Sequence, residues 1–266
     1  MYGAIIGDVC GSYYEFGDRR TKSKNPFLFQ PGSKFTDDTV MTIATMKWYV
    51  DGKKSPIETY YRWYGLKYPK VGYGGMFRKW LVDPKMGAYG SFGNGSAMRV
   101  SPVAWMNHCL RDVMKDAKIT AECTHNDPEG IKGAQATASA IYLARIGQTK
   151  NYIKAYIINN FGYNLERKLD DIRSDYKFDA TCQGSVPEAI MCFLEGRSYE
   201  ETIKLAISLG GDADTQAAIA GSIAEAYYGG VPAWMRQKVA QYILPHFEQE
   251  LRDYAKLESA EFYKFI

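Results

Sequence analysis

Two short acidic segments, far apart in the chain, carry side chains that could bind metal ions. The first reads Thr36-Asp37-Asp38-Thr39 and the second reads Gly210-Gly211-Asp212-Ala213-Asp214-Thr215. Each stands directly before an apolar run that is typical of a helix, at 40–50 and at 217–228. If the fold brings these two helix starts together, four carboxylates and two threonine hydroxyls share a small volume. Like charges packed that closely cannot all stay ionised without a cation between them.

This oxygen-only set of side chains suits a hard cation such as Mg²⁺, with Mn²⁺ as the alternative, rather than zinc or copper. The competing interpretation is helix capping, because Asp and Thr at a helix start accept hydrogen bonds from free backbone amides. A cap needs one acceptor, whereas each segment supplies two carboxylates and a hydroxyl. Gly210-Gly211 also gives the backbone the freedom that a close approach requires. The two segments together therefore favour a two-metal hydrolytic site over two caps.

Two glycine-rich loops could bind phosphate groups. They are Gly72-Tyr73-Gly74-Gly75-Met76-Phe77 and the denser stretch 87–99. Flexible backbone with free N–H groups near a helix start is suited to phosphate oxygens. Neither loop matches the P-loop or the dinucleotide fingerprint, and on its own each would pass as an ordinary turn. Tyr73, Tyr89 and Phe92 in the same loops would suit an adenine ring.

Two further residues are of types that could bind substrate or transfer protons, but their sequence context gives only weak evidence for such a role. His125 precedes the helix expected at 127–147, where a lone histidine is more often a local hydrogen-bonding residue than a catalyst. Glu15 follows Tyr13-Tyr14 near the end of the first expected helix and would pass as a solvated charge. No Ser-His-Asp context is present, so nucleophilic acyl transfer is unsupported.

The composition is that of an ordinary globular protein: 266 residues, 46% hydrophobic and 24% charged. A net charge of +3 does not indicate nucleic-acid binding by bulk electrostatics. The N-terminus lacks a basic stretch typical of a secretory signal, and no run approaches the roughly 18 apolar residues of a membrane span. The five cysteines are odd in number and match no zinc spacing, which is typical of buried thiols in a reducing compartment. We therefore expect a cytoplasmic protein, and a monomer.

Helical periodicity recurs along the chain, and no convincing series of strands is present. Helices are predicted at about residues 3–16, 37–51, 55–68, 73–82, 109–121, 127–147, 151–159, 184–196, 198–209, 213–229 and 232–254. Those at 127–147 and 213–229 are rich in Ala and Gly, so neighbours can approach closely and both should lie at the centre. The longest irregular stretches are 17–35, 83–102 and 162–182. With no repeat or linker, the sequence predicts one all-α domain over residues 1–266.

An ordered series of motifs over essentially the whole length resembles the ADP-ribosylglycohydrolase family, the magnesium-dependent all-α hydrolases that include dinitrogenase reductase-activating glycohydrolase. The motifs are Gly3-Ala4-Ile5-Ile6-Gly7-Asp8 with Gly11-Ser12, Thr36-Asp37-Asp38-Thr39, Gly93-Asn94-Gly95 with Met98-Arg99, Thr124-His125, Ser185-Val186-Pro187-Glu188-Ala189, and Gly210-Gly211-Asp212-Ala213-Asp214-Thr215. Each motif alone would be weak, whereas the ordered series is specific. The resemblance implies a single compact orthogonal helical bundle.

The resemblance also implies roles for individual residues. The metal ligands would be Thr36, Asp37, Asp38, Asp212, Asp214 and Thr215, which hold two Mg²⁺ ions. The diphosphate and a ribose would be held by Gly90, Ser91, Phe92 and Asn94, with Gly74 and Gly75 on the other phosphate loop and His125 on the ribose. The proton would be managed by Glu15, Asp37 or Asp38.

Glu15 and the stretch 90–95 are similar to the branch of the family that cleaves serine-linked and polymeric ADP-ribose. Three departures are visible. Ala213 replaces the threonine usual between the two aspartates, Phe92 stands where that branch often has tyrosine, and the chain is short for the branch. Ala213 is not a ligand position, so its change leaves metal binding intact. The loss of a hydroxyl at Phe92 and the short connections leave the exact substrate open.

The function implied is magnesium-dependent hydrolysis of an N- or O-glycosidic bond at ribose C1″, which releases ADP-ribose from an ADP-ribosylated protein or small conjugate. The residues alone leave a two-metal phosphohydrolase acting on a nucleotide as the alternative, because phosphates suit the same cations and glycines. A non-catalytic ADP-ribose binder or a structural protein of this fold would be expected to have lost ligands, and all six are present.

Overall fold

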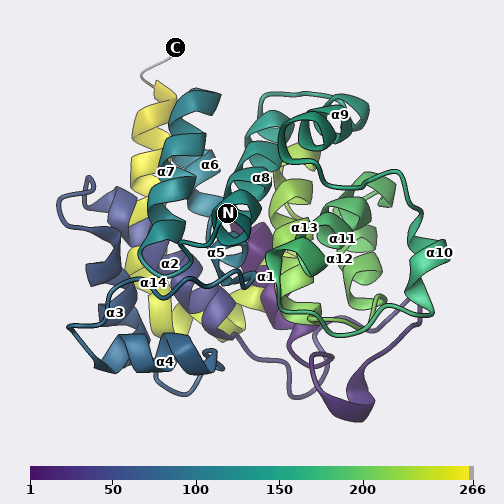
Figure 1. The fold of residues 1–266 in the computed structure, drawn as a ribbon, viewed down its shortest axis with the longest axis horizontal. Coiled ribbons are helices and arrows are strands. Elements are labelled where there is room, and N and C mark those ends of the chain that lie inside the picture. Colours follow the sequence, from purple (N-terminus) through teal and green to yellow (C-terminus); the bar gives the residue numbers. More distant parts are fainter. Residues whose placement is uncertain (264–266) are drawn as a thin grey trace.

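The computed structural model describes the backbone of residues 1–263 and the side chains of residues 1–257. Its helices are α1 (Tyr2–Gly11), η1 (Gly17–Arg19), α2 (Asp37–Val50), α3 (Ile57–Lys67), α4 (Gly75–Val82), α5 (Gly95–Met98), α6 (Ser101–Met106), α7 (Leu110–Glu122), α8 (Pro128–Arg145), α9 (Lys150–Phe161), α10 (Leu169–Arg173), α11 (Cys182–Glu195), α12 (Tyr199–Ile207), α13 (Ala213–Tyr228) and α14 (Ala233–Tyr263). Over these residues the only β pairing is an isolated bridge between Gly93 and Thr181. The predicted all-α class is confirmed (Figure 1).

The predicted helices differ from the observed ones mainly where elements are short. α5, α6 and α10 have four, six and five residues, too few for a periodic pattern, and they were missed. α1 ends at Gly11 rather than near residue 16, so Glu15 lies in the loop that follows. α14 runs to Tyr263, past the predicted end at 254, with non-helical backbone at Phe247 close after Pro245. A proline inside a helix removes a backbone hydrogen bond, which accounts for the kink.

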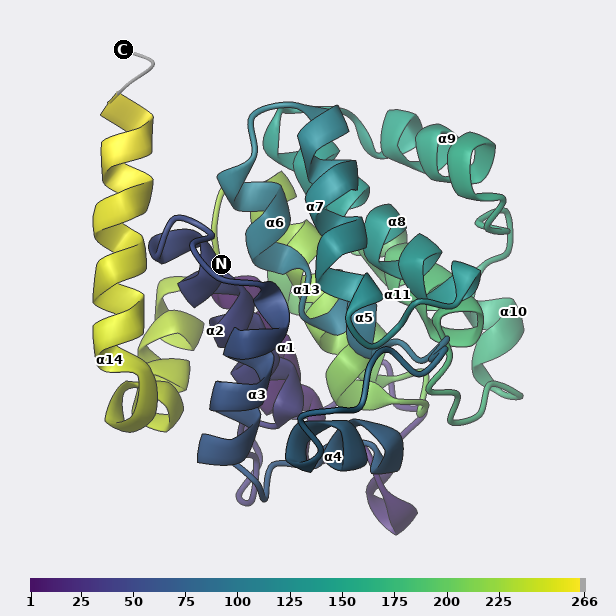
Figure 2. The same cartoon turned by 60° about the vertical axis from the view of Figure 1, so that its left-hand side comes forward.

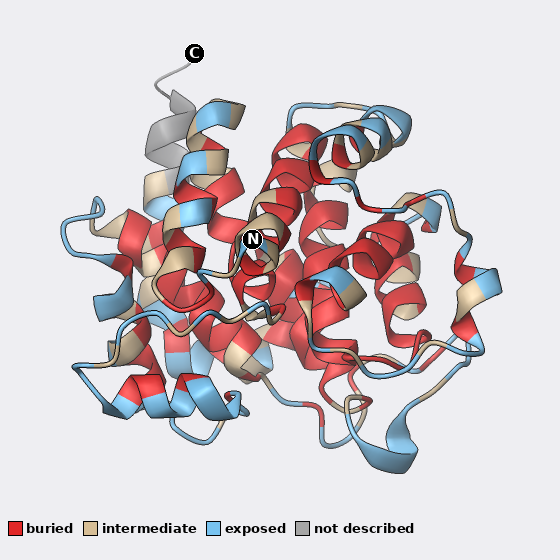
Figure 3. Ribbon diagram, viewed as in Figure 1, coloured by how far each residue is buried: buried red, intermediate tan, exposed pale blue. Residues whose placement is uncertain are grey.

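The centre of the molecule is formed by α1, α8 and α13, as the burial colours in Figure 3 show. Every residue of α13 from Ala213 to Ala226 is buried, as is every residue of α1 from Gly3 to Gly11. The central positions predicted for the two Ala- and Gly-rich helices are confirmed. α1 was not predicted to join them, although its sequence is equally rich in small residues.

α1 and α13 pack antiparallel through a ladder of small residues. Three glycines at four-residue spacing, Gly3, Gly7 and Gly11, lie on the backbone of α13 at Gly221, Ala217 and Ala213 respectively. A Cβ atom added to any of the three glycines would fall closer than 3.0 Å to an α13 backbone atom. The contact is therefore backbone on backbone, which only glycine permits.

A carboxylate joins the start of α1 to the last part of α13. Glu225 of α13 accepts hydrogen bonds from the backbone N–H groups of Tyr2 (2.9 Å) and Gly3 (2.8 Å), the first residues of α1. Free N–H groups at a helix start carry partial positive charge, so a carboxylate there is stabilising. These two hydrogen bonds fix the position of α1 along α13, while Gly3, Gly7 and Gly11 allow the two helices to approach closely.

The periphery consists of α4, α9, α10 and the long loop 17–35, which are the most exposed elements in Figure 3. Figure 2 shows the last part of α14 running along one edge of the molecule. It is held there by the buried side chains Phe247, Leu251 and Tyr254. Within the described residues, no helix combines the length and the apolar character needed to cross a bilayer.

We expect Gly7→Ala to destabilise the fold, because its new methyl group would collide with the α13 backbone. Overpacking a core costs about 1–3 kcal/mol, and backbone cannot step aside as a side chain can. The free energy of unfolding from urea titration should therefore fall by about 3 kcal/mol, although alanine otherwise favours a helix by about 1 kcal/mol. Gly87→Ala is the matched control, because a Cβ there meets nothing within 4 Å. Equal stability of the two variants would contradict this account of the α1–α13 contact.

Candidate metal and nucleotide site

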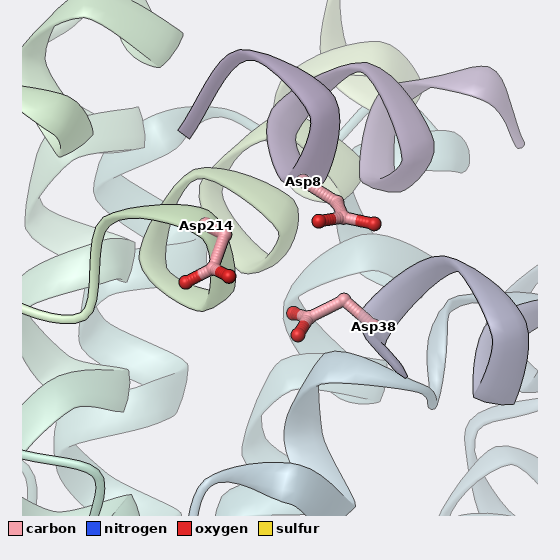
Figure 4. A group of neighbouring side chains, drawn as sticks. All are labelled: Asp8, Asp38 and Asp214. Carbon is pink, nitrogen blue, oxygen red and sulfur yellow. The ribbon is translucent and has the colours of Figure 1, made fainter. Parts of the chain in front are cut away.

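Carboxylates from three helices and one loop meet at the end of the α1–α13 pair. Figure 4 shows Asp8 of α1, Asp38 of α2 and Asp214 of α13 pointing toward one another. Oxygen atoms of these three carboxylates lie within 4.8 Å of one another, and so do oxygens of Glu15, Asp212 and Asp214. The two groups share Asp214. The acidic segments that the sequence places 170 residues apart are therefore brought together, as expected.

Asp8 is a member of this cluster that the sequence analysis did not single out. Its carboxylate accepts hydrogen bonds from Thr36 (backbone N–H 2.9 Å, hydroxyl 2.8 Å) and from Thr39 (backbone N–H 3.1 Å and hydroxyl). Asp8 thus ties the start of α2 to α1. The available signal was an aspartate alone in the otherwise apolar and small-residue run 3–11, where a buried charge requires partners.

The capping interpretation accounts for only part of the acidic segments. Thr36 does cap α2, because its hydroxyl accepts from the Asp38 N–H at 3.3 Å. Asp212 occupies the N-cap position of α13 but makes no capping bond. Across the gap, the Thr215 hydroxyl donates to Asp38 Oδ2 at 3.2 Å, whereas Asp38 Oδ1 is buried with no hydrogen-bond partner. A buried carboxylate oxygen without a donor is the arrangement expected of a metal ligand.

Burial and mutual repulsion shift the acid–base behaviour of the cluster. Desolvation raises the pKa of Asp37 to about 8, and neighbouring carboxylates add to the effect. The same causes raise the pKa of Glu15 to about 7 and hold those of Asp38 and Asp214 well above their ordinary range. Burial raises the pKa of Asp8 to about 6, against the opposing effect of its hydrogen bonds. The charge of this cluster is poorly compensated by protein groups, so the residues fit a divalent cation.

The glycine loop lies against the cluster and is held in place by backbone contacts. The N–H of Asn94 donates to the Ala180 carbonyl at 2.8 Å, and the N–H of Cys182 donates to the Phe92 carbonyl at 2.9 Å. The Asn94 side chain donates to Asp212 Oδ2 at 2.8 Å and to Ser185 Oγ at 3.1 Å. The segment 179–182 therefore supports the loop, a role that the sequence analysis missed because backbone groups supply it.

One cleft of about 450 Å³ joins the acidic cluster to the glycine loops. Pockets of roughly 300–1,000 Å³ hold most small-molecule ligands. Of the residues expected to contact substrate, the cleft is lined by Gly74, Gly75, Ser91, Asn94 and His125. Gly90 and Phe92 belong to the same loop but are not on the cleft wall, and Phe92 is 47% exposed.

Three lining residues lie outside the predicted site segments: Phe16, Phe178 and Ala180. Four others belong to the two predicted glycine loops but were given no role of their own: Met76, Phe77, Met98 and Arg99. Of the three aromatic residues expected to suit adenine, only Tyr89 lines the cleft, because the Tyr73 ring is buried against Phe77. Phe16 and Phe178 stand beside Glu15 with ring centroids 6.2 Å apart, which gives the acidic end of the cleft an apolar rim.

Known proteins share both sequence motifs and the fold with this chain. The family model for ADP-ribosylglycohydrolase matches residues 1–263. The chain is 28% identical to ADP-ribosylhydrolase ARH3 of Homo sapiens over 86% of this chain and 84% of the relative. It is 30% identical to ADP-ribosylarginine hydrolase Tri1 of Pseudomonas putida (strain GB-1) over 96% and 77% respectively. A solved structure described as an ADP-ribosylglycohydrolase-related protein complex shares the fold, with a TM-score of 0.70, 24% identity and coverage of 95% and 93%.

We expect Asp214→Asn to stabilise the metal-free protein and to remove its response to metal. The raised pKa means that the folded chain binds this proton more tightly than the unfolded chain. Without metal, the stability contributed by Asp214 is therefore fully present below its unfolded pKa and is lost as the pH rises through its folded pKa. At pH 7 the variant should gain about 1–2 kcal/mol in free energy of unfolding, because a poorly compensated buried charge disappears.

The same variant should lose the stabilisation by Mg²⁺, which for the native chain is about 2.7 kcal/mol at a hundredfold excess over Kd. Denaturant titrations with and without Mg²⁺ measure both effects. Asp171→Asn on exposed α10 is the matched control, with no change expected in either. A destabilised Asp214→Asn that still responds to Mg²⁺ would argue against metal binding here.

Proposed function

Because the chain belongs to the ADP-ribosylglycohydrolase family, we propose that it is a magnesium-dependent ADP-ribosyl hydrolase. It would cleave an N- or O-glycosidic bond at ribose C1″ and release ADP-ribose from an ADP-ribosylated protein or small conjugate. The observation that carries this proposal is the single cleft in which the carboxylate cluster and the glycine loops face the same space. Such a cleft can hold a nucleotide by its phosphates while a ribose lies over the acidic groups.

The ion ligands in this proposal are Thr36, Asp37, Asp38, Asp212, Asp214 and Thr215. Two ions are favoured because the two acidic groups share Asp214, so one carboxylate can serve both. Bound Mg²⁺ would supply Lewis acidity toward the ribose hydroxyls and would lower the pKa of a water molecule. Asp8 would act through Thr36 and Thr39, since its carboxylate already accepts their hydrogen bonds.

The nucleotide would be held by the two glycine loops. Gly74 and Gly75 begin α4, whose first N–H groups are free to receive phosphate oxygens, and neither glycine has other atoms in its way. Ser91 and Asn94, both on the loop 87–99, line the cleft where the diphosphate and the ribose would lie. The side-chain N–H groups of Asn94 donate to Asp212 and Ser185, so the side chain is held in one orientation and its carbonyl oxygen would be the atom offered to the ribose.

Glu15 is the residue that we propose manages the proton. Breaking the bond at C1″ builds positive charge on the ribose ring and negative charge on the leaving group. In the metal-free chain, burial and the neighbouring carboxylates raise the pKa of Glu15 to about 7. Glu15 also lines the cleft from the loop after α1, a position that suits a general acid or base. The alternatives are Asp38, which is buried in the acidic cluster, and Asp37, which is half-buried like Glu15 and belongs to neither close carboxylate group.

The chemical linkage that is cut stays open between nitrogen and oxygen. One similar relative is named an ADP-ribosylarginine hydrolase and another an ADP-ribosylhydrolase, at 30% and 28% identity. Arginine-linked, serine-linked, acetyl-ester and polymeric ADP-ribose should therefore be compared side by side, with and without Mg²⁺.

We further propose that the whole chain acts as one domain and that the catalytic unit is a monomer. Support for one domain comes from the cleft, whose lining residues are spread along the chain from Glu15 to Thr215. The five cysteines are free in the structure, which supports a reducing compartment such as the cytoplasm.

We expect Asp212→Asn to abolish turnover while the chain remains folded. The substitution removes one charge from the acidic group that includes Glu15, so metal affinity and kcat/KM should fall by at least about a hundredfold. The assay incubates an ADP-ribosylated substrate with Mg²⁺ and separates the products by chromatography. Free ADP-ribose supports the proposal, whereas AMP or phosphate would indicate a two-metal phosphohydrolase. Full magnesium-dependent turnover by Asp212→Asn would refute the site.

Glu15→Gln should lower kcat by about 10²–10⁴-fold, the usual contribution of a general acid or base. ADP-ribose affinity, measured by calorimetry with Mg²⁺, should change by less than about threefold, because Glu15 lies in the loop beyond α1 at the cleft edge. Glu166→Gln is the matched control on the exposed surface, and it should alter neither quantity. A large loss of affinity with unchanged kcat would instead make Glu15 a binding residue.

A further inference from the structure

Arg99 is a buried cation beside the cleft that the proposed chemistry leaves without a role. Its side chain is 1% exposed, and the guanidinium carbon lies 4.2 Å from the centre of the Tyr61 ring. Nη2 donates to the Thr120 carbonyl and to Thr124 Oγ1, each at 2.8 Å. Arginine has donors but no acceptor. The Thr124 oxygen must therefore be the acceptor in its bond with Arg99.

The hydroxyl proton of Thr124 is then free for the next residue. Thr124 is fully buried, and its Oγ1 lies 2.8 Å from Nδ1 of His125. The imidazole nitrogen is a strong acceptor, whereas the neutral thiol of the adjoining Cys123 is a weak one. Burial and the positive charge of Arg99 lower the pKa of His125 well below its ordinary value, so the ring is neutral. A neutral ring that accepts at Nδ1 carries its proton on Nε2.

Nε2 lies at the glycine loop that lines the cleft. A Cβ atom placed on Gly95 would come within 3.0 Å of this nitrogen, and one on Gly93 within 3.5 Å. Both glycines and His125 line the cleft. No described residue accepts a hydrogen bond from Nε2, so its proton is available to a molecule in the cleft.

We propose that Arg99 and Thr124 are positioning residues that fix His125 as the Nε2–H tautomer, aimed as a hydrogen-bond donor at an oxygen of the bound nucleotide. The direction of donation runs from Arg99 to Thr124, from Thr124 to His125, and from His125 into the cleft. Without this chain of bonds the ring could place its proton on Nδ1 and would present a lone pair to the ligand. A lone pair repels phosphate and hydroxyl oxygen atoms, whereas an N–H group attracts them. The part that concerns the ligand rests on the function proposed above.

The tautomer is measured directly by two-bond ¹H–¹⁵N NMR on the full chain with ¹⁵N-labelled histidine. The chain has three histidines, and His108 and His246 are exposed, so His108→Gln and His246→Gln assign the spectrum. We expect the native His125 to show an unprotonated Nδ1 and a protonated Nε2. A protonated Nδ1 in the native protein overturns the inference, whatever the behaviour of any variant.

Thr124→Val and Thr124→Ser form a matched pair, because valine keeps the shape and serine keeps the hydroxyl. Thr124→Val should populate the Nδ1–H tautomer and weaken ADP-ribose binding about tenfold, the effect of losing one hydrogen bond at a buried site. Thr124→Ser should restore the native tautomer and bring the affinity back to within about threefold. Unchanged tautomer and affinity in Thr124→Val would overturn the role of Thr124.

The two proposals fail in different ways. If the native protein with Mg²⁺ does not bind ADP-ribose, the proposed function falls, and the ligand part of this inference falls with it. If the native protein binds ADP-ribose but His125 is protonated on Nδ1, only the inference about Arg99 and Thr124 falls.

Discussion

The close contact between α1 and α13 decides where the carboxylates of the site lie. Glycines spaced four apart let the two backbones touch, and the antiparallel direction places the end of α1 beside the start of α13. This geometry carries Asp8 and Glu15, from the first helix and its following loop, to Asp212 and Asp214. α2 then joins through Asp8, which binds the start of that helix. A side chain in the ladder would separate the carboxylates as well as weaken the core.

The acidic cluster shows a conflict between stability and function. Buried carboxylates lose hydration and repel one another, and the raised pKa values of Asp37, Asp38 and Asp214 express that penalty. The surrounding fold does little to neutralise them, since Asp38 keeps one oxygen without a donor. A core selected only for stability would replace such residues. The presence of these carboxylates would be explained by a bound cation that neutralises their negative charge.

The long helices and the types of residue in the site could be predicted from the sequence. The short helices and some of the contacts that build the site could not. α2, α8 and α13 are runs of 14, 18 and 16 residues rich in apolar or small side chains, so their existence and the all-α class could be predicted. Helices of four to six residues, such as α5 and α10, leave no period to detect. That the acidic segments meet was inferred from their residue types and then from the family resemblance, since periodicity does not say which helix packs on which. Asp8 was missed because a single aspartate forms no pattern with other acidic residues nearby in the sequence. The segment 179–182 was missed because it supports the glycine loop through backbone groups, which the sequence does not distinguish. The catalytic and binding roles of the site residues stay predictions.

Asn94 belongs to both halves of the cleft, and this has a thermodynamic consequence. Its backbone N–H anchors the glycine loop to Ala180, while its side-chain amide holds Asp212 of the acidic cluster. A ligand that shifts the loop therefore alters the carboxylate, and an ion that recruits the carboxylate alters the loop. Heterotropic linkage of this kind is reciprocal, so whatever factor the ion contributes to nucleotide affinity, the nucleotide returns to ion affinity. Measured dissociation constants for one will have meaning only at a stated concentration of the other.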